Sequence, residues 1–163
     1  MSDPLTTLAA RVGARLKDRG VKLTAAESCT GGWVAQAVTS VSGSSDWFER
    51  GFVTYSNEAK REMLGVRAET LDRFGAVSEE TAREMALGAL AASRAQVAVA
   101  ITGVAGPTGG TPAKPVGMVC LAWASKESGV DTVTKHFPGD REAVRRQSVV
   151  CALEGVLERT GET

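Results

Sequence analysis

The sequence is poor in the residues that bind metals and form disulfides. It has one histidine, His136, and three cysteines, Cys29, Cys120 and Cys151, with no Cys-x-x-Cys pair. An odd number of widely spaced cysteines argues against a disulfide framework and against a structural zinc site. A single histidine excludes a histidine-rich metal site, and a Ser-His-Asp triad would have to use that one residue. We therefore expect a cytoplasmic protein that holds neither a metal nor another cofactor.

The chain also lacks an excess of charge of either sign and any long hydrophobic run. Nineteen lysine and arginine residues balance nineteen aspartate and glutamate residues, so no net charge attracts nucleic acid or an anionic membrane. No apolar stretch approaches the roughly 20 residues that span a bilayer. The first residues also lack the basic and then apolar segments of a secretory signal. We expect no nucleic-acid or membrane partner.

The remaining composition is that of a globular domain. Of the 163 residues, 43% are hydrophobic and 23% are charged, which is an ordinary mixture for a folded chain. The length suits one hydrophobic core, and no linker, repeat or low-complexity tract divides it. We expect a single domain over residues 1–163.

Apolar periodicity predicts alternating strands and helices. Helical spacing, with capping residues before it or glycines after it, is found at 5–19, 33–41, 57–64, 68–74, 79–90 and 141–159. Short apolar or alternating runs predict strands at 22–26, 51–55, 97–101, 116–124 and 130–137. A short turn joins the last two strands into a hairpin. This order predicts an α/β fold with a mixed, mainly parallel sheet of about five strands and helices on both faces.

Polar clusters follow three of the predicted strands. In open α/β sheets, ligands bind beyond the carboxyl ends of the strands. The first cluster is Glu-Ser-Cys-Thr-Gly-Gly at 27–32, and the second is Tyr-Ser-Asn at 55–57 with Lys60 one helical turn later. The third is a glycine-rich segment at 102–110. We expect the three clusters to form the walls of one site.

Ser28 lies between a strand and a helix N-terminus. There the amides of Cys29, Thr30 and Gly31 could stabilise an oxyanion, although Ser28 or Thr30 could also serve only as a helix cap. The adjacent Gly31 and Gly32 favour a ligand, because glycines permit its close approach. A helix N-terminus would lower the pKa of the Cys29 thiol, so Cys29 is an alternative nucleophile. It could equally be a small buried hydrophobic residue.

Lys60 and Tyr55 are candidates for proton transfer. A lysine acts as a base only when it is neutral, so its pKa would have to fall from roughly 10.4 toward about 7–8. A serine paired with such a lysine is a known alternative to serine–histidine catalysis. A solvated lysine on a helix and a half-buried strand tyrosine are the competing interpretations.

Two further features are compatible with a bound nucleotide. The segment 102–110 lacks both the Gly-Lys-Ser/Thr ending of a P-loop and a Gly-x-Gly-x-x-Gly motif, yet its amides could line a nucleotide pocket. It could also be only a flexible connection. Arg141 and Arg145 lie four residues apart at the start of the last helix, on one face, where a phosphate could bind. Surface arginines without a ligand are the alternative.

Several strings of residues resemble the CinA C-terminal domain family. They occur in order through nearly the whole chain, at 26–32, 51–60, 75–78, 102–107, 114–117 and 137–141. The chain is similar to the stand-alone form of the family, without the N-terminal domain of the longer CinA proteins. The resemblance implies a three-layer α/β/α fold and a homo-oligomer, a dimer or higher.

The resemblance also implies nicotinamide-nucleotide amidohydrolase activity. Nicotinamide mononucleotide and water would give nicotinate mononucleotide and ammonia, a step in pyridine nucleotide recycling. The catalytic serine, tyrosine and lysine proposed for the family fall on Ser28, Tyr55 and Lys60, with Ser28 attacking the carboxamide and Lys60, assisted by Tyr55, taking its proton. The residues expected to bind the substrate are Cys29, Thr30, Gly31, Gly32, Asn57, Thr102, Gly103, Gly106, Arg141 and Arg145.

A different class of function stays open at this point. CinA-like proteins are associated by name with competence and DNA damage, so the domain could be a non-catalytic nucleotide-binding or protein-interaction module.

Overall fold

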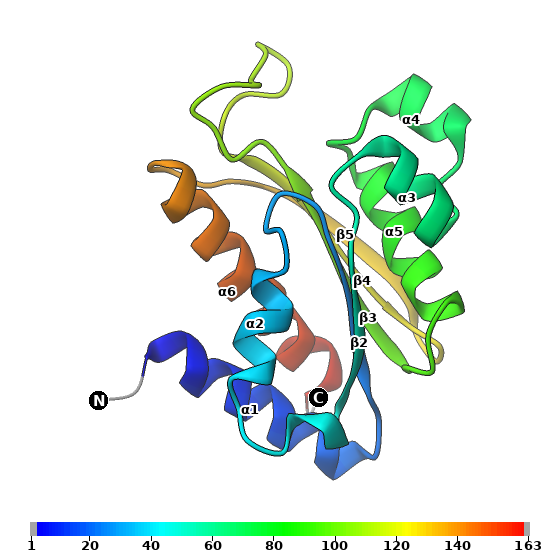
Figure 1. Cartoon of the computed structure of the whole chain (residues 1–163), viewed down its shortest axis with the longest axis vertical. Helices are drawn as coiled ribbons and strands as arrows, with labels where there is room; N and C mark the ends of the chain where they lie inside the picture. The colour runs from blue at the N-terminus through cyan, green and yellow to red at the C-terminus, as the bar shows by residue number, and fades with distance from the viewer. Residues whose placement is uncertain (1–2, 162–163) are drawn as a thin grey trace.

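The computed structural model describes residues 3–161 and places a five-stranded sheet between two layers of helices (Figure 1). The strands are β1 (Leu23–Glu27), β2 (Phe48–Val53), β3 (Val97–Gly103), β4 (Met118–Ser125) and β5 (Gly129–His136). Their order in the sheet is β2-β1-β3-β4-β5. Strand β1 is parallel to both of its neighbours, whereas β4 is antiparallel to β3 and to β5. The predicted mixed, mainly parallel sheet with a C-terminal hairpin is confirmed.

Within residues 3–161, six α-helices cover the two faces of the sheet. They are α1 (Pro4–Arg19), α2 (Trp33–Thr39), α3 (Asn57–Leu64), α4 (Ala68–Phe74), α5 (Glu79–Ala91) and α6 (Arg141–Thr160). Helices α1, α2 and α6 lie on one face, and α3, α4 and α5 lie on the other (Figure 1). The predicted three-layer arrangement is therefore confirmed. In the range 3–161, no helix combines the length and the apolar character needed to cross a membrane.

The second strand differs from its prediction. It was expected at 51–55, but it runs from Phe48 to Val53, and a short 3-10 helix (η1, Ser44–Asp46) precedes it. The charged pair Glu49 and Arg50 hid the start of the strand, because an edge strand tolerates charge that a central strand does not. The strand stops at Val53 because its partner β1 ends at Glu27.

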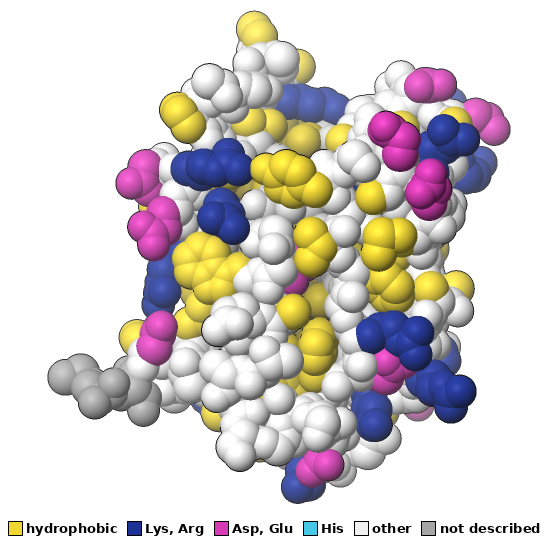
Figure 2. Space-filling model, in the orientation of Figure 1, with side chains coloured by type: hydrophobic (Ala, Val, Ile, Leu, Met, Phe, Trp, Pro, Cys, Tyr) yellow, Lys and Arg dark blue, Asp and Glu magenta, His cyan; other side chains and the backbone are white. Residues whose placement is uncertain are grey.

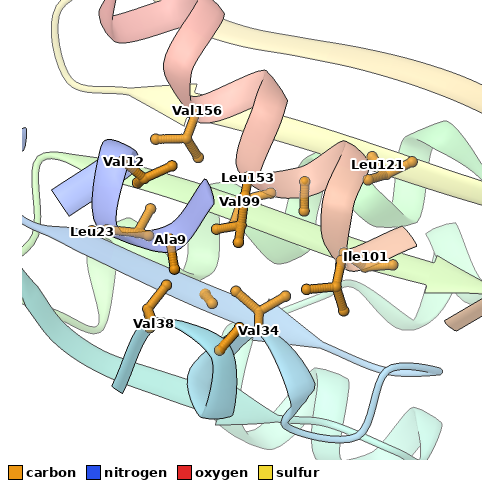
Figure 3. Close-up of a cluster of buried hydrophobic side chains, with 14 of the residues drawn as sticks. Ala9, Val12, Leu23, Val34, Val38, Val99, Ile101, Leu121, Leu153 and Val156 are labelled. Atoms are coloured by element: carbon orange, nitrogen blue, oxygen red, sulfur yellow. The ribbon is translucent and has the colours of Figure 1, made fainter. Parts of the chain in front are cut away.

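Side chains of the central strands alternate between two apolar clusters. On β3, Val97, Val99 and Ile101 point to the cluster under α1, α2 and α6, whereas Ala98 and Ala100 point to the cluster under α5. Figure 3 shows the first cluster, where valine, leucine and isoleucine side chains from helices and sheet interdigitate. The second cluster is lined mainly by alanines, so α5 packs closely on the sheet. Both faces are buried, as parallel sheets require.

Glycine in α6 makes room for a tryptophan of the sheet. The Trp123 indole N–H donates to the carbonyl oxygen of Ala152 at 2.9 Å, and its ring lies against Gly155. A Cβ atom at position 155 would overlap that ring.

We expect Gly155→Ala to lower the free energy of unfolding by about 1–3 kcal/mol, because overpacking forces the ring or the helix to move. Without the tryptophan, the same change inside a helix would stabilise by up to about 1 kcal/mol. Urea unfolding distinguishes the two signs, with Glu154→Ala on the exposed face of α6 as the matched control. A more stable Gly155→Ala protein would contradict this packing account.

Candidate active site

The three polar clusters meet at one edge of the sheet. They follow β1, β2 and β3, which are parallel neighbours in the order β2-β1-β3, so their carboxyl ends lie side by side. The N-terminal part of α6 reaches the same edge, because Arg141 and Arg145 hydrogen-bond to residues of these clusters. On the face seen in Figure 2, basic and acidic side chains are interspersed, and neither sign covers the surface.

Lys60 and Ser28 form the centre of the site. The Lys60 Nζ lies 3.0 Å from the Ser28 Oγ and donates to the Thr54 carbonyl oxygen at 2.9 Å. Helix α3 places it there, because the Ser56 side chain caps this helix by accepting from the Ala59 amide. The Lys60 side chain is 1% exposed, and burial lowers its pKa below the ordinary value of 10.5. None of the ion pairs formed within residues 3–161 involves Lys60, so no carboxylate offsets this effect.

The loop after Ser28 presents free amides. The Gly31 amide, expected to face a ligand, instead donates to the Ser28 carbonyl oxygen at 3.0 Å. Across the part of the chain that the structure describes, the amides of Cys29, Thr30 and Gly32 donate to no acceptor. Gly31 and Gly32 have φ values of 59° and 107°, which side-chain-bearing residues rarely adopt. The glycine pair is thus required by the backbone of the turn itself.

Glu27 belongs to the first predicted cluster but was given no role there, and the structure shows that it organises this loop. The residue is 1% exposed, and its carboxylate accepts from the Thr30 hydroxyl at 2.6 Å and from the amides of Val34 and Ala35 at 2.9 and 3.0 Å. It therefore satisfies the first turn of α2, whose N-cap, Gly32, has no side chain to do so. A carboxylate at the end of an apolar buried strand was the available signal in the sequence.

Tyr55 lies at the rim of the site. Its side chain is 63% exposed, and its hydroxyl accepts from Arg141 Nη2 at 3.0 Å. Arg141 Nη1 donates to the Gly106 carbonyl oxygen at 2.9 Å, which links the glycine-rich segment to α6. Tyr55 forms no hydrogen bond with Ser28 or Lys60 in residues 3–161, although the sequence suggested that it assists Lys60.

Arg145, one turn further along α6, contacts the loop after Ser28. Its Nε and Nη2 donate to the carbonyl oxygens of Cys29 and Thr30, both at 3.1 Å. Arg141 and Arg145 thus both reach the predicted site, but through different segments.

The other predicted binding residues are spread around this centre. Asn57 is exposed at the first turn of α3, and the Thr102 hydroxyl donates to the Ala76 carbonyl oxygen at 2.8 Å. Gly103 ends β3, where a Cβ atom would press on the backbone of β4. A hollow of about 460 Å³ lies beside Arg141, lined by Ala105, Pro107, Val116 and Gly139 among others. Over residues 3–161, no group of three or more histidine, cysteine, aspartate or glutamate side chains is arranged to hold a metal ion.

The Cys29 thiol is protonated at neutral pH. Burial raises its pKa to about 11, and the opposing effects of its own backbone amide, Arg145 and Lys60 are smaller. The sequence suggested a lowered pKa because Cys29 lies near a helix N-terminus; that suggestion is wrong because desolvation of the thiolate dominates. A protonated thiol is a poorer nucleophile than a thiolate, which argues against Cys29 in that role.

The buried amine of Lys60 should make stability depend on pH in a specific direction. When the pKa of a lysine is lower in the folded state, the unfolded chain takes up the proton first as the pH falls. The free energy of unfolding therefore decreases below the unfolded-state pKa. Relative to Lys60→Met, we expect the wild type to lose about 1.4 kcal/mol for each pH unit below 10.5, until the folded-state pKa is reached. Chemical denaturation over a pH series measures this. Lys126→Met, at an exposed lysine, controls for loss of a lysine as such; parallel pH curves for the wild type and Lys60→Met would refute the desolvated amine.

Comparisons with known proteins place the chain in a family. Residues 5–160 match the family model described as CinA C-terminal domain. The nicotinamide-nucleotide amidohydrolase PncC of Escherichia coli (strain K12) is 57% identical over 155 residues, which cover 95% of this chain and 94% of the relative. The protein of the same name from Pseudomonas putida is 55% identical over 156 residues, covering 96% and 97%. The crystal structure of the competence/damage inducible protein CihA from Agrobacterium tumefaciens has a TM-score of 0.95 at 45% identity, covering 99% of this chain and 98% of that one. The chain belongs to the CinA C-terminal domain family.

Proposed function

We propose that this protein is an amidohydrolase that converts nicotinamide mononucleotide and water into nicotinate mononucleotide and ammonia. The observation that carries the proposal is the buried Lys60 amine, 3.0 Å from the Ser28 hydroxyl and with a lowered pKa. This pair has the geometry of a nucleophile and its general base. The names of the relatives that match over nearly their whole length support the choice of substrate.

The first half of the reaction forms an acyl-enzyme. The Ser28 oxygen bonds to the carboxamide carbon while its proton passes to neutral Lys60, and the carbonyl electron pair moves onto oxygen. The free amides after Ser28 stabilise this oxyanion. When the tetrahedral intermediate collapses, the carbon–nitrogen bond breaks, and the leaving nitrogen takes the proton from Lys60 to depart as ammonia. An ester on Ser28 and a neutral Lys60 result.

The second half of the reaction releases the acid. Water bonds to the ester carbon while Lys60 again accepts a proton. The ester bond then breaks, and the Ser28 oxygen recovers that proton from Lys60. Because the same amine serves in both halves, it must return to its neutral form each time, and its burial favours that form.

We assign Tyr55 and Arg141 to substrate binding. The Tyr55 hydroxyl accepts a hydrogen bond from Arg141, and Tyr55 is largely exposed beside the site. Arg141 borders the hollow next to the glycine-rich segment and is the residue we propose for the substrate phosphate. We further infer that the enzyme works in the cytoplasm as a homo-oligomer in pyridine nucleotide recycling, an inference supported by its family.

A non-catalytic interaction module is the weaker alternative. Burying the Lys60 amine with no carboxylate partner among residues 3–161 destabilises the fold, and docking to a partner does not require the Ser28–Lys60 pair. A role of the Lys60 amine in removing the Ser28 proton would explain why the fold keeps this amine buried.

Removal of the Ser28 hydroxyl should abolish ammonia release, whereas removal of the Cys29 thiol should leave it nearly unchanged. We expect Ser28→Ala to lower ammonia release from nicotinamide mononucleotide by at least about 10³-fold, because the nucleophile is lost. Cys29→Ala should stay within about tenfold of the wild type, because its protonated thiol has no part in the chemistry. Ammonia is measured in the presence of a chelator, with circular dichroism to verify the fold. Ammonia release at the wild-type level by folded Ser28→Ala would reject Ser28 as the nucleophile, and so would loss of release in folded Cys29→Ala. If the folded wild type releases no ammonia, nicotinamide mononucleotide is not the substrate.

A further inference from the structure

Arg145 binds the backbone of the loop that follows the candidate nucleophile. Its Nε and Nη2 donate to two consecutive carbonyl oxygens, those of Cys29 and Thr30, each at 3.1 Å. The guanidinium also lies over the ring of Trp33, with its carbon 5.5 Å from the ring centre. The Arg145 guanidinium thus uses two of its N–H groups and one face for contacts within the protein.

These contacts fix the direction of one free amide. In a planar trans peptide, the C=O and the following N–H point in opposite directions. The bond between Cys29 and Thr30 is trans, since the one cis bond in residues 3–161 is Gly106–Pro107. Because Arg145 holds the Cys29 carbonyl oxygen, the Thr30 N–H must point away from Arg145. That amide is one of the three that donate to no acceptor in the described chain.

Glu27 holds the same residue from the interior. Its buried carboxylate accepts from the Thr30 hydroxyl at 2.6 Å and from the Val34 amide at 2.9 Å. Thr30 is thus fixed through its side chain by Glu27 and through the two carbonyls flanking its Cα by Arg145. A loop held in this way can keep an amide oriented before any ligand binds, which is what electrostatic stabilisation of a transition state requires.

We propose that Arg145 is a positioning residue that, together with Glu27, aims the Thr30 amide at the oxyanion formed on the substrate carboxamide. This inference rests on the proposed function, because it assigns a role in the same reaction. It replaces the role suggested by the spacing of Arg141 and Arg145, in which both would bind phosphate. Arg145 acts through the backbone and does not touch the reacting atoms.

The two roles of Arg145 predict different kinetics. A phosphate ligand contributes mainly to binding, so its loss raises KM. A residue that orients the oxyanion amide contributes in the transition state, so its loss lowers kcat. Arg145→Lys separates them, because lysine keeps the positive charge but cannot reach both carbonyl oxygens with a fixed fork. Arg146→Lys is the matched control: Arg146 is the next residue of α6, is half-buried, and pairs with Asp3 at 2.8 Å.

The experiment has two measurements on the full chain. The first is kcat and KM for ammonia release from nicotinamide mononucleotide. The second is the rate at which diisopropyl fluorophosphate labels Ser28, followed by mass spectrometry. In that labelling, the Ser28 oxygen bonds to phosphorus, fluoride leaves, the serine proton passes to Lys60, and the phosphoryl oxygen takes the position of the oxyanion. The probe carries no charge, so a phosphate-binding arginine would not affect it.

We expect Arg145→Lys to lower both kcat and the labelling rate by about 10²–10³-fold, the usual effect of losing one oxyanion donor, with KM within about threefold. Arg146→Lys should leave all three values unchanged. A raised KM with unchanged kcat and labelling would overturn the proposal in favour of a phosphate ligand. Equal labelling of the wild type and Arg145→Lys, including no labelling of either, would also overturn it.

Failure of the proposed function has a separate signature. A wild type that is labelled but releases no ammonia has a different substrate, and the ratio of labelling rates still decides the role of Arg145. If Arg145→Lys does not fold, Arg145→Gln replaces it, since its shorter side chain has a single donor nitrogen in place of Nε and Nη2. We expect Arg145→Gln to lose at least as much labelling as the lysine variant, and wild-type labelling in this folded variant would overturn the proposal.

Discussion

The arrangement of this site depends on a lysine amine that the fold keeps out of water. Lys60 is one of the largest fully buried side chains of the protein, and its amine is held between the Ser28 hydroxyl and the Thr54 carbonyl oxygen. Desolvation disfavours its charged form, and no ion pair formed within residues 3–161 offsets this effect. Such a group is unfavourable for stability and valuable as a base at moderate pH. The strands and loops around Lys60 hold its amine next to Ser28.

The order of the strands brings the two halves of the pair together. Because β1 lies between β2 and β3, the segments after β1 and β2 leave the same edge side by side. The Thr54 amide donates to the Glu27 carbonyl oxygen at 2.8 Å, and this bond ties the segment that binds Lys60 to the segment that carries Ser28. The Glu27 side chain then fixes the loop beyond Ser28. Glu27, the residue before the proposed nucleophile Ser28, thus links the proposed base Lys60, the loop and the sheet.

The layers of the fold could be predicted from the sequence, and the error was confined to the bounds of one strand. Helical and strand periods are read from neighbouring residues, so the sheet and its hairpin followed, whereas the charged start of β2 at Glu49 hid the beginning of that strand.

The site residues could be grouped because polar clusters followed three strands. The partners of each side chain could not be predicted, since they depend on packing between distant segments. The spacing of Arg141 and Arg145 indicates a shared helix face, but not that Arg145 is engaged by the backbone at Cys29. Glu27 was missed because its three donors lie in a loop and a helix of unknown direction.

The central claim is that Lys60 is neutral when Ser28 needs a base. The direct measurement is an NMR titration of protein with ¹³C-labelled lysine, in which the Lys60 signal is identified by its absence from Lys60→Met. The account predicts a midpoint below 10.5 that coincides with the pH at which kcat/KM for nicotinamide mononucleotide rises to its plateau. A midpoint at the ordinary lysine value, or activity that is complete while Lys60 is still protonated, would contradict it.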